Sequence, residues 1–173
     1  MKSTTTRSIG YPAILLALVS ICGAARAQTG RVSKEGDLAP RFSITTDRGQ
    51  RIRSGAVRGL LVVNFWETSC VPCLKEMPSV ADFARRCQSE HVTVVAIGED
   101  EDAQKYHRFL QDHQSDLETY RDRHRLISKS FGTYMFPETY IIQNGRIIRK
   151  VVGAIDWMGG DLTAFVSARL QSR

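Results

Sequence analysis

The sequence predicts an α/β fold in which helices cover both faces of a mixed central sheet, giving three layers (α/β/α). Strand-like apolar runs alternate with segments that carry apolar residues at helical spacing along most of the chain. Residues 61–66 are apolar almost without interruption, which is typical of a central strand buried on both faces. Asn144-Gly145 between two apolar runs predicts an antiparallel hairpin, so the sheet should contain both strand orientations.

The other elements follow from the same local patterns. Short apolar runs bounded by turn residues predict further strands at 42–46, 51–53, 91–98, 117–120, 139–142 and 146–152. Apolar residues three or four positions apart predict helices at about 70–88, 100–113, 125–131 and 160–170. A chain of this length can bury one good core, so we expect a single folded domain over residues 39–173.

The N-terminus is typical of an exported protein. Lys2 and Arg7 flank the start of a mostly apolar stretch, 11–23, which has the length of a signal-peptide core and is too short for an ordinary transmembrane helix. Ala25-Arg26-Ala27 fits the cleavage pattern of signal peptides. We therefore expect residues 1–27 to be a signal peptide that directs the protein to the periplasm, with a retained membrane anchor as the alternative.

Residues 28–38 are polar and aperiodic, which predicts a flexible leader before the domain.

The charge of the chain argues against nucleic acid as a partner. The chain has 24 Lys and Arg against 18 Asp and Glu, a net charge of +6, and the excess is spread out. This is not the footprint of a nucleic-acid-binding protein. The densest basic run, residues 121–125, is interpreted as a solvated turn, with the docking of a partner as the alternative.

Cys70-Val71-Pro72-Cys73 directly follows the predicted central strand and opens a predicted helix. Two cysteines at this spacing can form a disulfide and be reduced again. The helix N-terminus favours a thiolate because its free N–H groups and its dipole stabilise negative charge. Cys70, expected to be the more exposed, would attack, and Cys73 would resolve the mixed disulfide. The motif beside a β-α-β pattern predicts thiol–disulfide exchange in a thioredoxin-like fold.

Other chemistries of these cysteines stay open as alternatives. The cysteine pair could bind Cu(I) in a metallochaperone-like module, because soft thiolates select that ion. Cys87 and His91 complete a zinc-like spacing, but a continuous helix would separate Cys73 from Cys87 by about 21 Å, so no metal site is expected. A peroxiredoxin would need a threonine three residues before Cys70, whereas Thr68 is two before it. Cys87 lies on the apolar helix face and is expected to be a buried, unreactive thiol.

Five short motifs occur in a fixed order along the chain. They are Val63-Asn64-Phe65-Trp66, Cys70-Val71-Pro72-Cys73, Glu76-Met77-Pro78, Pro137-Glu138-Thr139 and Asn144-Gly145. Through them the chain resembles the TlpA/ResA/CcmG branch of the thioredoxin superfamily over nearly all of the region after the leader. The resemblance implies a thioredoxin-like fold with an additional βα insertion, which we place at about 98–120.

The resemblance also implies roles for residues near the cysteines. Glu76, one helical turn after Cys73, would be a partly buried carboxylate that exchanges protons with it, and burial would raise the pKa of Glu76. Asn64 stands where thioredoxin has a buried acid and would support Glu76. Pro137 would be a cis-proline facing the cysteines, which leaves the backbone of Phe136 free to pair with an extended substrate.

Residues around the motif are expected to contact the substrate. They are Trp66, Ser69, Val71, Pro72 and Phe136. Ser69 stands where the family usually has a large residue, and Glu67 stands where alanine is common. A Glu67 carboxylate directed at Cys70 would raise the pKa of that thiol and slow its attack, whereas one directed at solvent would do little.

The dipeptide between the cysteines indicates the direction of electron flow. Val71-Pro72 carries no charge and no histidine, which favours a reductase over an oxidase. The resemblance implies an exported substrate with a disulfide, either the C-x-x-C-H disulfide of apocytochrome c or the cysteine pair of a copper-site assembly protein. A reductase in an oxidising compartment would need a membrane electron donor of the DsbD/CcdA type. No cofactor beyond the redox-active disulfide is expected.

Overall fold

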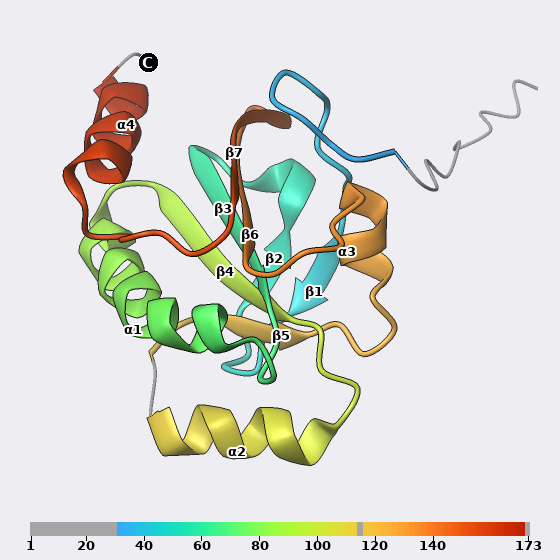
Figure 1. Ribbon diagram of the computed structural model, residues 1–173. Helices are drawn as coiled ribbons and strands as arrows, with labels where there is room; N and C mark the ends of the chain where they lie inside the picture. The colour runs from blue at the N-terminus through green and yellow to red at the C-terminus, as the bar shows by residue number, and fades with distance from the viewer. Residues whose placement is uncertain (1–30, 114–115, 172–173) are drawn as a thin grey trace, which may run out of the picture.

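The computed structural model describes residues 31–113 and 116–171, which contain a mixed five-stranded sheet (Figure 1). Its strands are β3 (Leu60–Trp66), β4 (Val92–Gly98), β5 (Thr119–Arg121), β6 (Glu138–Gln143) and β7 (Arg146–Val152), in the order β5-β4-β3-β6-β7. Strand β3 runs parallel to β4 and antiparallel to β6, so the two orientations meet at the central strand. The predicted mixed sheet is confirmed.

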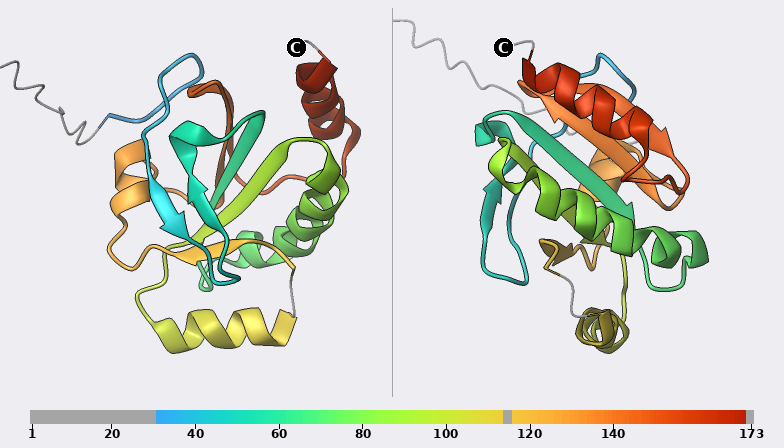
Figure 2. Two further views of the ribbon diagram at one scale, coloured as in Figure 1. Left: turned by 180° about the vertical axis from the view of Figure 1, so that it is seen from behind. Right: turned by 90° about the vertical axis from the view of Figure 1, so that its left-hand side faces the viewer.

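Two groups of elements cover the faces of the sheet (Figure 2). They are α1 (Val71–Arg86), α2 (Ala103–His113), α3 (Leu126–Phe131), α4 (Gly160–Gln171), and a small sheet of β1 (Ser43–Thr45) and β2 (Arg51–Arg53). Residues of α1, α2 and α4 form one apolar core with Trp66 and Trp157. Residues of α3, β1 and β2 form the other core, around Phe65 and Phe131. The three-layer prediction is confirmed, with the β1–β2 sheet sharing one outer layer with α3.

The pleat of β3 positions a polar side chain under α1. Alternate residues of a strand point to opposite faces, and Leu60, Val62 and Trp66 belong to the core on the α1 side. Asn64 has the same parity, so its side chain points toward α1 as well. Asn64 is also the register partner of Thr139 on β6. This arrangement lets an otherwise apolar central strand contribute one buried amide to the layer beneath the cysteines.

Residues 31–38 differ from the flexible leader that the sequence predicts. Ser33 is buried, and its amide donates to the carbonyl of Phe131 at 2.9 Å. The Gly36 amide donates to a carbonyl of β7 at 2.8 Å, and Leu38 forms a β-bridge with the first residue of that strand. Backbone groups hold the segment in place, and backbone groups are the same in every sequence. Composition alone therefore could not predict this docking.

The signal peptide expected at the N-terminus, and the retained membrane anchor that is its alternative, both remain predictions. Among the described residues, no helix is both long enough and apolar enough to cross a membrane. The expected signal peptide or anchor, residues 1–27, lies outside the described part of the chain.

Candidate active site at the start of helix α1

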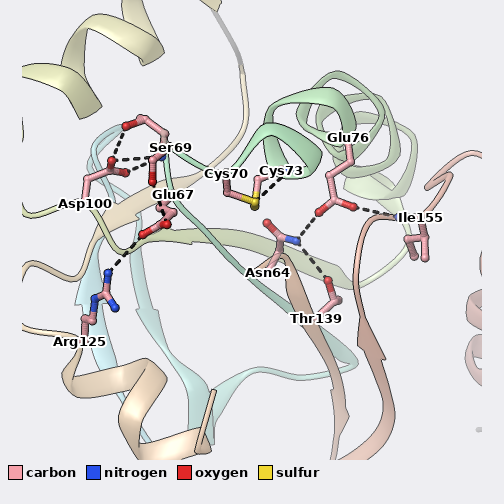
Figure 3. Close-up of a disulfide and its surroundings, with 11 residues drawn as sticks. Asn64, Glu67, Ser69, Cys70, Cys73, Glu76, Asp100, Arg125, Thr139 and Ile155 are labelled. Atoms are coloured by element: carbon pink, nitrogen blue, oxygen red, sulfur yellow. Dashed lines mark hydrogen bonds and ion pairs between the residues drawn. A yellow bond between two sulfur atoms is a disulfide. The ribbon is translucent and has the colours of Figure 1, made fainter. Parts of the chain in front are cut away.

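A disulfide joins Cys70 and Cys73 at the N-terminus of α1 (Figure 3). Cys70 is the N-cap residue, and its sulfur accepts a hydrogen bond from the Cys73 amide at 3.2 Å. Cys73 is fully buried, whereas Cys70 is partly exposed and the intervening Val71 and Pro72 are exposed. One sulfur of the pair is thus open to a partner, and the other is protected behind it.

A buried carboxyl, Glu76, lies on the same helix one turn beyond Cys73 (Figure 3). The amide nitrogen of Asn64 donates to one carboxyl oxygen at 2.9 Å and to the Thr139 hydroxyl at 3.1 Å. The backbone amide of Ile155 donates to the other carboxyl oxygen at 3.1 Å. These contacts fix the carboxyl between α1, β3, β6 and the loop before α4. The sequence indicated Asn64 and Glu76, but not Thr139 or Ile155 as their partners.

Burial raises the pKa of Glu76 above its ordinary value, because the charged form loses hydration. Hydrogen bonds from the Ile155 amide and from Asn64 oppose this shift without cancelling it. The direction matches the expectation from the sequence. A carboxyl of this kind can take up or release a proton close to neutral pH more readily than an exposed glutamate, which is the property that acid–base catalysis requires.

The peptide bond between Phe136 and Pro137 is cis, as the resemblance implied. Pro137 is buried at the start of β6, and Phe136 is half-buried. The two preceding residues, Tyr134 and Met135, are exposed by 72% and 49%. Sequence reasoning missed both of them. Their signal was the presence of large apolar side chains in a loop directly before the proline.

Trp66 does not fit its predicted role as a substrate contact. Its side chain is fully buried and packs against Tyr106 and Phe109 of α2, with ring centroids 5.8 and 5.0 Å away. A large apolar side chain at the end of a strand can face either the core or the surface, and here α2 covers it. Trp66 therefore supports the loop that carries the cysteines from below rather than meeting a partner from outside.

The loop between β3 and Cys70 is held by polar contacts. Ser69 is exposed, and its hydroxyl donates to one carboxylate oxygen of Glu67 at 2.8 Å. The other oxygen accepts from the guanidinium of Arg125 at 3.2 Å (Figure 3). Glu67 is thus directed at Arg125, which is neither of the two orientations weighed from the sequence. The basic run that was interpreted as a solvated turn contributes this partner, so that interpretation is wrong for Arg125.

The same loop is anchored by the segment that follows β4. The carboxylate of Asp100 is buried and accepts hydrogen bonds from the Thr68 amide at 3.1 and 3.2 Å and from the Thr68 hydroxyl. On its outer side, Ser69 lines a shallow hollow together with Lys105 and Arg108 of α2. The loop that leads into Cys70 is thus held by Asp100 and lies beside side chains of α2.

The third cysteine of the described chain lies apart from this site. Cys87 follows α1, is buried, and is not in a disulfide. Burial raises the pKa of its thiol to about 11, so it is almost entirely protonated at neutral pH, in line with the unreactive thiol expected from the sequence. Within residues 31–113 and 116–171, no three His, Cys, Asp or Glu side chains are placed to share a metal ion.

Comparisons with known proteins agree with this geometry. The AhpC/TSA family matches residues 36–151. The thiol-disulfide oxidoreductase ResA of Bacillus subtilis (strain 168) is 29% identical over 123 residues, which cover 70% of this chain and 69% of that protein. ResA of Bacillus cereus (strain ATCC 10987 / NRS 248) is 30% identical over 147 residues, which cover 81% of this chain and 84% of that protein.

Solved structures support the fold. A thioredoxin-family thiol:disulfide interchange protein from Chlorobium tepidum TLS superposes with a TM-score of 0.67 at 22% identity, covering 80% of this chain and 99% of that one. StoA from Bacillus subtilis superposes with a TM-score of 0.66 at 18% identity, covering 74% and 96%. The fold is thus thioredoxin-like. Given the family match and the ResA relatives, the chain belongs to the AhpC/TSA family and is a thiol-disulfide oxidoreductase of the ResA type with its cysteine pair at Cys70 and Cys73.

Proposed function

We propose that this oxidoreductase is an exported disulfide reductase that acts in the periplasm. The observation that carries the proposal is the arrangement of three groups at the start of α1. Cys70 is partly exposed, Cys73 is fully buried behind it, and the buried Glu76 carboxyl follows one turn later. This order suits a nucleophile, a resolving thiol and a proton acceptor, respectively.

In the first step, the Cys70 thiolate attacks one sulfur of a substrate disulfide. A new bond forms between Cys70 and that sulfur, the substrate disulfide breaks, and the other substrate sulfur leaves as a thiolate that takes up a proton. The Cys73 amide, which donates to the Cys70 sulfur, and the other free N–H groups of the helix N-terminus favour the attacking thiolate.

In the second step, Cys73 releases the product. Its thiol must lose a proton before it can attack the Cys70 sulfur, and ionised Glu76 is the proposed acceptor of that proton. The attack forms the Cys70–Cys73 disulfide and expels the second substrate sulfur as a thiolate, which takes up a proton as Glu76 releases the one it accepted. The substrate has gained two electrons and two protons, and the enzyme has lost them. A raised pKa of Glu76 brings it closer to the pKa of a thiol, which makes this transfer less costly.

The residues between the cysteines support the reducing direction. Strong oxidants such as DsbA stabilise their reduced thiolate heavily and have potentials near about −120 mV, against about −270 mV for thioredoxin. Val71 and Pro72 are exposed and uncharged, so they add no stabilising charge to the thiolate. A reductase in the periplasm needs a supply of electrons, and we propose a membrane donor of the DsbD/CcdA type.

The proposed substrates are exported proteins whose cysteine pairs must be reduced before they bind a cofactor, such as apocytochrome c or a copper-site assembly protein. Exposed apolar side chains, Val71 at the start of α1 and Tyr134 and Met135 in the loop before the cis-proline, suit an extended segment of another protein. The backbone of Phe136, before the cis-proline, is the proposed site of strand-like pairing.

The redox state of the cysteine pair in cells tests the proposal. Acid quenching followed by thiol alkylation in a Cys87→Ser background should find Cys70 and Cys73 mostly reduced, and oxidised when the donor is deleted. Cys73→Ser should trap substrates on Cys70, whereas the double variant Cys70→Ser/Cys73→Ser should trap none. A mostly oxidised pair would contradict the reducing direction. Tight one-to-one Cu(I) binding without disulfide reduction would instead favour the metallochaperone alternative.

A further inference from the structure

Arg125 has an unusual backbone for a residue with a long side chain. It immediately precedes α3, with φ 55° and ψ 36°, in the left-handed region that glycine enters freely and other residues rarely adopt. An arginine held in this conformation is expected where its side chain makes contacts that outweigh the backbone cost. The contacts of the guanidinium are therefore the feature to explain.

The guanidinium lies between two loops, the one that leads into Cys70 and the one that leads into Pro137. One nitrogen donates to Glu67 at 3.2 Å, in the loop that leads into Cys70. Its central carbon, Cζ, lies over the ring of Phe136, 5.7 Å from the ring centroid, in the loop that leads into Pro137. A cation over an aromatic face is attracted by the electrons of the ring. One side chain thus connects the segments that carry the attacking sulfur and the cis-proline.

The two other carboxyl groups near Arg125, those of Glu99 and Asp122, do not compete strongly with Glu67 for its positive charge. Glu99, immediately after β4, is fully buried, and its nearer carboxyl oxygen is 4.0 Å from Nε of Arg125. Burial raises the pKa of Glu99 to about 8, so at neutral pH it is mostly uncharged. The carboxylate of Asp122 accepts from the amides of Leu126 and Ile127 at 3.1 and 2.6 Å and is committed to the start of α3.

We propose that Arg125 is a positioning residue for the thiol–disulfide exchange of this enzyme: it pairs with the Glu67 carboxylate beside Cys70 and holds Phe136 in place at the substrate-facing loop. The inference rests on the proposed role of Cys70 as the attacking thiol. Without Arg125, an unpaired negative charge would stand three residues before a thiol that must become a thiolate, and like charges disfavour that ionisation.

The measurable effect on Cys70 is modest and specific. Glu67 and Arg125 are partly solvated, with side chains 25% and 42% exposed, so a high effective dielectric applies. Loss of the pairing should raise the pKa of Cys70 and so slow its alkylation by about threefold at a pH below that pKa. Loss of the contact with Phe136 should separately weaken the binding of an extended substrate.

The test uses the reduced full-length protein and four variants: Arg125→Gln, Glu67→Gln, the double variant, and Arg123→Gln as the control. Arg123 is exposed on the same turn, so its substitution removes one positive charge without touching either loop. Iodoacetamide labelling of Cys70 is followed against pH, with the labelled site identified by peptide mass. Arg125→Gln should move the pH profile of labelling to higher pH and slow labelling below the pKa of Cys70 by about threefold. Arg123→Gln should do neither, and adding Glu67→Gln should restore the profile.

Turnover of a peptide disulfide supplies the second readout. Arg125→Gln should raise KM, and Glu67→Gln should not correct that increase, because the contact with Phe136 remains lost. A Cys70 profile that moves equally in Arg123→Gln and Arg125→Gln, or one that Glu67→Gln does not restore, would overturn the electrostatic part. An unchanged KM would overturn the part that concerns Phe136. Labelling requires no substrate, so a wild-type protein that failed to reduce disulfides would contradict the proposed function and leave the labelling result interpretable.

Discussion

Glu99 offers the sharpest test of how burial controls charge in this protein. Its side chain has no solvent exposure, one oxygen accepts from the Ser128 hydroxyl at 2.7 Å, and the other has no hydrogen-bond partner among the described residues. Burial raises its pKa from about 4.5 to about 8. Ionisation of this buried carboxyl should destabilise the folded protein. Glu99→Gln puts an amide of nearly the same shape in its place, and the amide cannot ionise.

The sign and size follow from linkage. Between about pH 4.5 and pH 8 the folded protein keeps a proton on Glu99 that the unfolded chain releases, so the free energy of unfolding falls as the pH rises. One proton corresponds to about 1.4 kcal/mol per pH unit. From pH 5 to pH 8 the wild type should therefore lose about 3 kcal/mol that Glu99→Gln does not lose. The full contribution is present at low pH and disappears as the pH approaches 8.

Urea denaturation of the oxidised protein at pH 5, 6, 7 and 8 measures this difference. The other ionisable groups are the same in both proteins, so their contributions cancel when the two free energies are subtracted. A constant offset would reflect the imperfect hydrogen bonding of the amide, and only the slope reports on the charge. Glu101→Gln, at the exposed neighbouring position, is the matched control and should run parallel to the wild type. Parallel curves for Glu99→Gln as well would refute the reasoning.

Three further substitutions or modifications test other parts of the structure. Asn64→Ala removes two buried hydrogen bonds, so it should lower the free energy of unfolding, measured with urea, by about 2 kcal/mol. It should also raise the pKa of Glu76 further, which a pH titration of the Glu76 carboxyl by NMR would show. An unchanged pKa would contradict the hydrogen-bond network. Lys150→Met leaves the buried Glu138 without its ion-pair partner, which should cost about 3 kcal/mol in the same assay, and adding Glu138→Gln should recover much of the loss. In the native reduced protein, iodoacetamide at neutral pH should spare Cys87, whose pKa is about 11, and label it only in denaturant.

Most of the fold could be predicted because its signals are local. The apolar run of β3, the cysteine motif that begins α1 and the Asn144-Gly145 turn each act within a few residues. In the turn, both residues have positive φ, 51° and 75°, which asparagine and glycine tolerate. Helix α2 begins at Ala103, slightly later than predicted, because Asp102 caps it by accepting from the amides of residues 104 and 105. Boundaries shift in this way while the elements persist.

Apart from Asn64 and the cis-proline Pro137, which the family resemblance implied, the site could be predicted only where its residues are neighbours in sequence. Cys70, Cys73 and Glu76 share one helix, so their spacing places them together. Arg125 is 58 residues from Glu67, and no periodicity links the two. The burial of Trp66 depends on α2, whose path the sequence does not specify. Residues that come into contact only after the sheet has assembled leave no local pattern in the sequence. Their contacts can be identified only from the structure.

The docking of residues 31–38 also says something about the order in which the chain folds. These residues leave the ribosome early, yet their partners are made last: the Ser33 carbonyl accepts from Lys150, 117 positions later. Closing so long a loop costs conformational entropy, and no stabilising contacts offset that cost until the β6–β7 hairpin has formed. The N-terminal segment should therefore attach to a nearly finished domain and close its assembly rather than start it.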